Sequence, residues 1–278
     1  MQIKFFRPRN PLLSTYMEGY YFLAHGAEDQ EISYLTFPNN YSILTFCTDT
    51  IIRHEGDRYR ISGIPSAGCL SELICHYKQP LRICYEGAVK EITFYFKPLG
   101  LNAFLPQPLS AYTADMFRRF EPYEDFLAVM SAILEEPDED TRCKRLECYW
   151  LSRLTGFEHP FLHAMVGDMQ DRETVYTIEE LAAKYGTTRQ QIYKQFELHL
   201  CKTPVAFRKI QRFRDALLQS IDSRRKKETL AALSYDAAFY DQSHLIKDFK
   251  AFTGHTPKKF FEKISLQENA AINWLYLQ

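Results

Sequence analysis

The stretch from Thr188 to Phe207, TRQQIYKQFELHLCKTPVAF, decides the fold of the C-terminal third of the chain because its pattern occurs twice. The second copy, DQSHLIKDFKAFTGHTPKKF, runs from Asp241 to Phe260, 53 positions later. The matching positions are Ile192, Lys194, Phe196, Thr203, Pro204 and Phe207, which recur as Leu245, Lys247, Phe249, Thr256, Pro257 and Phe260. Such a repeat predicts one small helical unit that is built twice.

Each unit is predicted to hold two helices joined by a turn. Thr177-Ile178-Glu179-Glu180 has the pattern of a capping box, in which the threonine and the second glutamate satisfy each other's backbone N–H groups. The first helix should end near Tyr185, and Gly186 allows the turn. Thr188 can then cap a second helix that reaches about Leu200. In the second unit Leu230, Leu233 and Ser234 match Ile178, Leu181 and Ala182 at a separation of 52, so one extra residue falls in its turn.

The second helix of each unit has one apolar face and one face rich in hydrogen-bond donors. Residues four apart share a helix face, so Ile192 and Phe196 point inward together, as do Leu245 and Phe249. The outward residues are Arg189, Gln190, Tyr193 and Lys194 in the first copy, and Gln242, Ser243, Ile246 and Lys247 in the second. His244 lies at the margin of the second face, where it could meet a phosphate of a nucleic acid. Glutamine can pair with adenine, lysine and arginine with guanine, and tyrosine with a thymine methyl group or a phosphate.

A long helix from Val205 to about Ile221 should fix the separation of the two outward faces. Successive major grooves lie about 34 Å apart on one side of B-DNA, so a rigid pair of helices could enter both. The alternative, two merely solvated helix faces, accounts poorly for the matched spacing. On the connecting helix, Arg208, Lys209 and Arg214 could be solvated or could bind phosphates. The same two roles are open for the basic run from Arg224 to Lys227. Arg212 is instead expected to hold the two units together.

Charge is distributed unevenly along the 278 residues, of which 46% are hydrophobic and 25% charged. Residues 177–263 hold 17 Lys/Arg against 10 Asp/Glu, a net charge of +7, although the whole chain carries −1. The remainder therefore carries −8. A basic module on an acidic body indicates polyanion binding by the C-terminal part, and the length allows two domains.

These motifs resemble the DNA-binding domain of AraC/XylS-type regulators over roughly residues 170–263. The first half of that domain is similar to 186–196, Lys202-Thr203-Pro204, Arg212-Phe213 and Ala216, and the second half to 239–250 and 252–257. The resemblance implies base-facing roles for Gln190, Tyr193, Lys194, Gln242, Ser243 and Lys247. The sequence departs from the family pattern at Ser234, Ala238 and Cys201. At Ala238 and Cys201 a side chain replaces glycine in a turn, where it must adopt a less comfortable φ.

The N-terminal part is predicted to be a mostly antiparallel β sandwich or barrel with a pocket. Between Tyr16 and Lys97 apolar residues alternate, and β-branched and aromatic types dominate. The clearest runs are 32–37, 41–47, 81–85 and 92–96, with breaks at 38–40, 55–57 and 86–87. Gly63-Ile64-Pro65 and the segment 92–101 are similar to an N-terminal domain of a bacterial subgroup of the same regulators, which implies effector binding or dimerisation.

We therefore expect an α+β chain in three parts: a β-rich sensor or dimerisation domain (1–120), a helical connector (121–168) and an all-α double helix-turn-helix domain with an apolar tail (169–278). The tail should pack on the protein or on a partner. The expected function is sequence-specific transcription regulation. The expected partner is double-stranded promoter DNA, and a small-molecule effector, RNA polymerase and a second copy of the chain are further candidates. An adaptor whose N-terminal domain binds only a protein is the alternative.

Other classes of function find little support in the sequence. No stretch approaches the roughly 18 apolar residues of a membrane span and no secretory signal is present, so we expect a cytoplasmic protein. The seven cysteines form no C-x-x-C pair, which favours reduced, mostly buried thiols over redox or metal sensing. No H-x-H metal motif occurs in the β region, and His159 and His163 are separated by Pro160. We expect no cofactor, no metal and no enzymatic activity, including that of methyltransferases with a reactive cysteine.

Overall fold

A computed structural model describes residues 1–113, 118–171, 174–224, 242–257, 259–260, 264–266 and 275–277. The strands of the N-terminal part are β1 (Gln2–Phe6), β2 (Met17–His25), β3 (Ile32–Thr36), β4 (Ser42–Thr48), β5 (Thr50–Glu55), β6 (Arg58–Gly63), β7 (Cys69–Ile74), β8 (Leu81–Glu86), β9 (Val89–Phe96) and β10 (Arg118–Arg119). Its helices are α1 (Pro11–Tyr16), two 3-10 helices (Gly100–Phe104 and Leu109–Tyr112), α2 (Phe126–Leu134) and α3 (Glu139–Ser152).

Two six-stranded sheets form the N-terminal sandwich. The first has the order β1-β2-β9-β4-β7-β10. The second has the order β11-β12-β3-β8-β6-β5, in which β11 (Ile264–Leu266) and β12 (Leu275–Leu277) come from the C-terminal part of the chain. The β6–β8 pair is parallel and the other described pairs are antiparallel. The prediction of a mostly antiparallel β sandwich is thus confirmed.

The space between the two sheets is filled largely by tyrosine rings and aliphatic side chains. Tyr21 of β2 and Tyr95 of β9 face Tyr34 of β3 and Tyr85 of β8 across this space. Successive residues of a strand point to opposite faces. Tyr20 of β2 therefore belongs to a second core, on the outer face of the first sheet.

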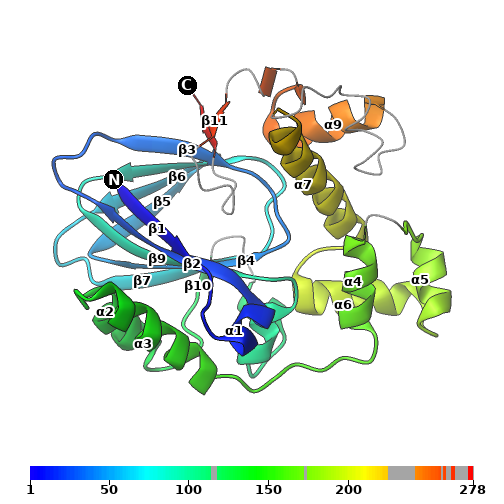
Figure 1. Cartoon of the computed structure of the whole chain (residues 1–278), viewed down its shortest axis with the longest axis horizontal. Coiled ribbons are helices and arrows are strands. Elements are labelled where there is room, and N and C mark those ends of the chain that lie inside the picture. The colour runs from blue at the N-terminus through cyan, green and yellow to red at the C-terminus, as the bar shows by residue number, and fades with distance from the viewer. Residues whose placement is uncertain are drawn as a thin grey trace.

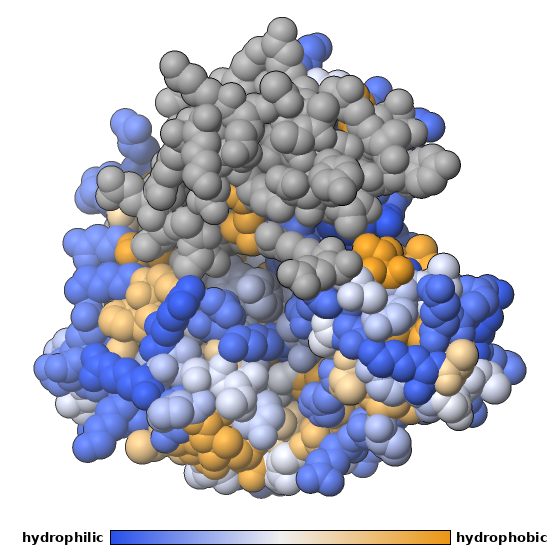
Figure 2. Space-filling model, turned by 45° about the vertical axis from the view of Figure 1, so that its right-hand side comes forward, coloured by the Kyte–Doolittle hydropathy of each residue, from blue (hydrophilic) through white to orange (hydrophobic). Residues whose placement is uncertain are grey.

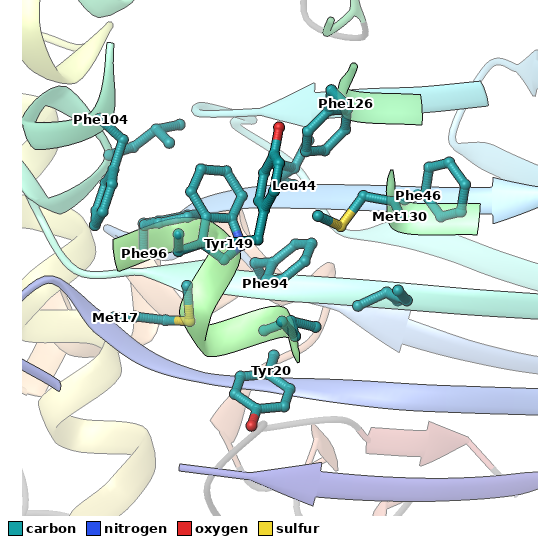
Figure 3. Close-up of a cluster of buried hydrophobic side chains, with 14 of the residues drawn as sticks. Met17, Tyr20, Leu44, Phe46, Phe94, Phe96, Phe104, Phe126, Met130 and Tyr149 are labelled. Carbon is teal, nitrogen blue, oxygen red and sulfur yellow. The ribbon is translucent and has the colours of Figure 1, made fainter. Parts of the chain in front are cut away.

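That outer core is aromatic and is covered by helices (Figure 3). Trp150 of α3 packs its ring 5.4 Å from Phe94 and 5.0 Å from Phe96, both of β9. Phe126 of α2 lies 6.1 Å from the same tryptophan. The first sheet is consequently buried on both faces. Within the expected connector, α2 and α3 thus belong to the sandwich core, whereas α4 (Leu162–Gln170) packs with helices nearer the C-terminus.

The C-terminal part contains α5 (Ile178–Lys184), α6 (Arg189–Leu200), α7 (Pro204–Arg224) and α9 (Gln242–Thr253). In Figure 1 the long helix α7 runs between the α4–α6 group and α9. The first helix expected in the second unit, around Leu230, lies outside the described residues. Among the described helices none is long and apolar enough to cross a bilayer.

The end of the chain returns to the sandwich. β11 (Ile264–Leu266) pairs with β12 (Leu275–Leu277), and Leu275 of β12 pairs with Leu35 of β3. Figure 1 shows this short hairpin beside β3. The tail was expected to pack on the protein or on a partner, and these backbone segments pack on the protein.

Candidate functional site

The first helix-turn-helix unit forms as the sequence predicts. Thr177 Oγ1 accepts a hydrogen bond from the Glu180 backbone N–H at 3.1 Å, and Glu180 Oε2 accepts from the Thr177 N–H at 2.6 Å, which completes the capping box. Gly186 has φ +59° in the turn, and Thr188 caps α6 by accepting from the Gln191 N–H at 3.2 Å. Capping satisfies N–H groups that the first helical turn leaves without partners.

The predicted contact residues of α6 are on its outer side. Gln190 and Lys194 are exposed, whereas Ile192 and Phe196 are buried. Tyr193 is half-buried and packs against the core of this unit.

Arg189 is exposed and forms an ion pair with Glu179 of α5 at 2.6 Å. Both side chains are solvated, and exposed pairs of this kind contribute only about 0–1 kcal/mol. The guanidinium can therefore exchange its partner for a phosphate at little cost.

The second predicted reading helix corresponds to α9. Lys247 is exposed on it, and Phe249 is buried. The predicted contact residues Gln242, Ser243 and His244 form its first turn, but their side chains lie outside the part that the structure describes. Residues 225–241, with most of the basic run and the Ala238 position, also lie outside it.

Both α6 and α9 pack on α7. Phe196 of α6 lies 5.8 Å from Phe207, measured between ring centroids. At the other end Phe213 lies 5.2 Å from Phe249 of α9. Close-packed interiors resist deformation, so α7 fixes how α6 and α9 are spaced.

An ion pair reinforces the contact between α7 and α9. Lys209 Nζ lies 2.8 Å from Asp248 Oδ1, and Asp248 is buried with 2% of its surface exposed. A buried carboxylate requires such a partner. Lys209 therefore holds α9 in place, a role that the sequence did not indicate.

Arg214 was expected to be solvated or to clamp a phosphate, and both expectations are wrong. It is buried, and it donates hydrogen bonds to the carbonyl oxygens of Pro38, at 2.7 Å from Nε, and of Phe37. Phe37 also packs on Phe260 with ring centroids 5.1 Å apart. Arg214 thus joins the helical domain to the loop that follows β3.

Two further contacts join the domains nearer α6. Asn40 Nδ2 donates to the Phe207 carbonyl at 3.1 Å, and Asn102 Nδ2 donates to the His199 carbonyl at 2.9 Å. Leu99, at the end of the sandwich, is buried in the core of the first unit. Both helix-turn-helix units therefore dock on the sandwich.

Cys201 ends α6 with φ +54°, the left-handed conformation that glycine usually supplies. The predicted departure from comfortable geometry at this position is confirmed. Its thiol lies 3.0 Å from Thr113 Oγ1, so the turn between α6 and α7 touches the N-terminal part of the chain.

A pocket of about 540 Å³ opens beside Cys201. Its walls come from the β5–β6 turn, from the segment between β7 and β8, and from the end of α6. The lining residues are Gly56, Asp57, Cys75, His76, Tyr77, Lys78, Gln79, Pro80, Leu81, Thr113 and Cys201. The pocket is thus shared by the sandwich, for which a pocket was predicted, and the helical domain.

Buried polar groups surround this pocket. Burial lowers the pKa of Lys202 to about 8, and its Nζ donates to the Asn39 carbonyl at 3.3 Å. Burial and the nearby Lys202 and Lys78 lower the pKa of His76 to about 4. Hydrogen bonds from Cys75 and Thr113, with the Lys202 charge, lower the pKa of Cys201 to about 7. Perturbed titratable groups in a cavity are typical of functional sites.

A smaller cavity, of about 40 Å³, lies between the two sheets. The buried Glu91 carboxylate at its wall accepts hydrogen bonds from Tyr21 Oη at 2.5 Å, Thr93 Oγ1 at 2.7 Å and Tyr85 Oη at 2.8 Å. Burial nevertheless raises the pKa of Glu91. This volume holds little more than a water molecule or two.

Comparison with known proteins identifies the helical domain. Residues 181–263 match a family model described as a helix-turn-helix domain. With the repeated units and the exposed faces of α6 and α9, this match makes the C-terminal part an AraC-type DNA-binding domain. Figure 2 shows mostly hydrophilic residues, with smaller hydrophobic patches, on the described part of this side of the molecule.

No curated protein sequence matches the chain. Among solved structures it is similar to ToxT from Vibrio cholerae, with a TM-score of 0.45 and 9% identity to an apo variant, over 87% of this chain and 97% of that one. For wild-type ToxT with a bound unsaturated fatty acid the TM-score is 0.44 and the identity 11%, over 86% and 94%. Similarity at this level carries no inference about function.

Proposed function

We propose that the chain is a transcription regulator that reads two successive major grooves of promoter DNA through α6 and α9, under the control of a small molecule in the interdomain pocket. The observation that carries this proposal is that residues of both domains line the pocket. It joins the segment between β7 and β8 to Cys201, the residue that ends α6.

The packing on α7 supports reading by two helices. Phe207 and Phe213, on this one helix, contact α6 and α9 respectively. A single stiff element therefore sets the separation of the two helices, as binding to consecutive grooves on one side of the duplex requires.

The proposed role of each contact residue follows from the chemistry of its side chain. Gln190, Tyr193 and Lys194 of α6 contact base edges, and Gln242, Ser243 and Lys247 of α9 do the same in the next groove. Arg189 and His244 contact phosphates. Base contacts determine sequence preference, whereas phosphate contacts set affinity and orientation.

A ligand in the pocket could influence DNA binding because it would contact both domains. The volume of about 540 Å³ is within the range of about 300–1,000 Å³ that is typical of small-molecule sites. A molecule that binds one arrangement of the domains more tightly shifts the protein toward that arrangement. The pocket favours this control by an effector over the adaptor alternative, which would need only a protein-binding face.

Selection of genomic DNA fragments by the purified full-length protein, with and without candidate metabolites, tests both parts of the proposal. We expect enrichment of a short common sequence and a change in affinity with at least one metabolite. If about 6–10 phosphates are engaged, affinity should fall by roughly 10³–10⁵ between 50 and 200 mM salt. Enrichment of no common sequence would contradict the DNA-reading role, and metabolites without effect would contradict the effector role.

A further inference from the structure

Two cysteines of different domains meet at the wall of the interdomain pocket. Cys75 follows β7 in the sandwich, and Cys201 ends α6 in the helical domain. Cys201 packs against the core cluster that contains Cys75, and both residues line the same pocket. A small solute that enters the pocket therefore comes close to the pair.

We propose that Cys75 and Cys201 form a redox pair that a hydroperoxide entering the pocket converts to a disulfide, which ties the sandwich to the end of reading helix α6. The effect on DNA binding rests on the function proposed above, whereas formation of the disulfide does not depend on that function.

The surroundings give the two sulfur atoms different roles. Cys201 is partly exposed and lies 3.0 Å from Thr113 Oγ1 and next to buried Lys202, groups that stabilise a thiolate. Cys75 is buried, with 5% of its surface exposed, and lies 3.8 Å from Ser42 Oγ. The thiolate is the nucleophile in thiol chemistry. Cys201 is therefore the attacking thiol and Cys75 the resolving one.

The reaction balances with hydrogen peroxide as the oxidant. The Cys201 thiolate attacks one peroxide oxygen, the O–O bond breaks, and sulfur becomes a sulfenic acid while the second oxygen leaves and is protonated to water. The Cys75 sulfur then attacks the Cys201 sulfur, the S–O bond breaks, and the hydroxide takes up the Cys75 proton as a second water. The pair loses two electrons, and one peroxide is reduced to two waters.

The bond would close a long loop between distant parts of the chain. Because 126 positions separate Cys75 from Cys201, the disulfide restricts the unfolded chain strongly. We expect the temperature midpoint of unfolding to rise by roughly 5–10 °C on oxidation.

Peptide mapping of the full-length protein, treated with a small excess of hydrogen peroxide and digested without reductant, tests the proposal directly. We expect the peptides that contain Cys75 and Cys201 to be linked, and the link to disappear with dithiothreitol. Cys148→Ser is the matched control because Cys148 is exposed on α3, away from the pocket, and this variant should form the same link. Unlinked Cys201, or its conversion to sulfinic acid while Cys75 stays a free thiol, would overturn the proposal.

Two variants separate loss of the bond from loss of the fold. Cys75→Ser removes the resolving thiol with little change of volume. Cys201→Gly removes the attacking thiol and suits the left-handed backbone at this position, so it should fold at least as well as the parent. Neither variant should show the rise in unfolding temperature with peroxide.

The effect on DNA is measured with a fragment that the reduced protein selects. The bond fixes the end of α6 to the sandwich and removes its freedom to adjust to the groove, so we expect the oxidised protein to bind at least about threefold more weakly. Dithiothreitol should restore affinity, and Cys75→Ser should be insensitive to peroxide. A linked protein with unchanged affinity would overturn the regulatory part alone. If no DNA is bound by the reduced protein, the proposed function fails, but the disulfide is still judged by mapping.

Discussion

Replacement of Lys202 by methionine should stabilise the protein at neutral pH. This lysine is 4% exposed, and its Nζ has one hydrogen bond, to the Asn39 carbonyl. Burial lowers its pKa from 10.5 to about 8 against a partial opposing effect of Cys75 and Cys201. At about 1.4 kcal/mol per pH unit, this difference corresponds to about 3 kcal/mol of destabilisation at pH 7, where the amine is charged in both states.

The sign and size of the change in the free energy of unfolding follow from the difference in proton binding at Lys202 between the folded and unfolded chain. Between pH 8 and 10.5 the unfolded chain binds more protons at Lys202 than the folded one, so the stability of the parent protein rises with pH through this window. Loss of the hydrogen bond to Asn39 costs the variant about 1 kcal/mol at every pH. Lys202→Met should therefore be about 2 kcal/mol more stable than the parent at pH 7 and about 1 kcal/mol less stable above pH 10.5.

Urea unfolding in reducing buffer at a series of pH values from 7 to 11 measures this difference, because titrating groups away from Lys202 affect both proteins equally. Lys194→Met is the matched control, since it removes the same charge from an exposed position and should leave the pH dependence of stability unchanged. A constant difference between Lys202→Met and the parent across the range would refute the reasoning. So would a variant that is less stable at pH 7.

Three further predictions concern separate parts of the molecule. Burial raises the folded-state pKa of Glu91, so the parent protein loses stability as the pH rises from about 4.5 through that higher value. Glu91→Gln should remove this pH dependence in urea unfolding. A variant with the same pH profile as the parent would contradict this. Arg214→Met should lower the free energy of unfolding by about 1–3 kcal/mol because the Pro38 carbonyl loses its Arg214 donor and the Phe37 carbonyl keeps only the hydrogen bond from Tyr77 Oη. Unchanged stability would show that the Arg214 hydrogen bonds contribute nothing net. Lys194→Ala and Lys247→Ala should each cost roughly 1–3 kcal/mol on the selected site and relax preference at one base position, and wild-type mobility-shift titrations for both would exclude these roles.

The helical units could be predicted closely from the sequence because their signals are local. Thr177, Gly186 and Thr188 each act within a few residues, through caps and a positive φ. The buried pair Ile192 and Phe196 likewise follows from helical spacing.

The sandwich was predictable in class but less so in packing. Alternation in the run 92–96 indicated a strand, but it did not indicate that Phe94 packs on α3 while Tyr95 faces the second sheet. Both faces are buried because α2 and α3 cover the first sheet. Periodicity reports which residues are apolar, but it does not report which element covers them.

Contacts between the domains could not be predicted because they join residues far apart in the chain. Arg214 lies in a basic helix, where a solvated or phosphate-binding role is the natural expectation, and its acceptors are the distant carbonyls of Phe37 and Pro38. The pocket unites Cys75 and Cys201 in the same way. No local spacing marks either arrangement.

Hydroxyl-radical footprinting of the full-length protein on a selected DNA fragment tests the central claim most directly. If α6 and α9 enter consecutive major grooves, one protein molecule should protect two patches on the same side of the duplex, about 10 base pairs apart. Lys194→Ala should weaken one patch and Lys247→Ala the other. A single protected patch, or two patches on opposite sides of the duplex, would contradict the account.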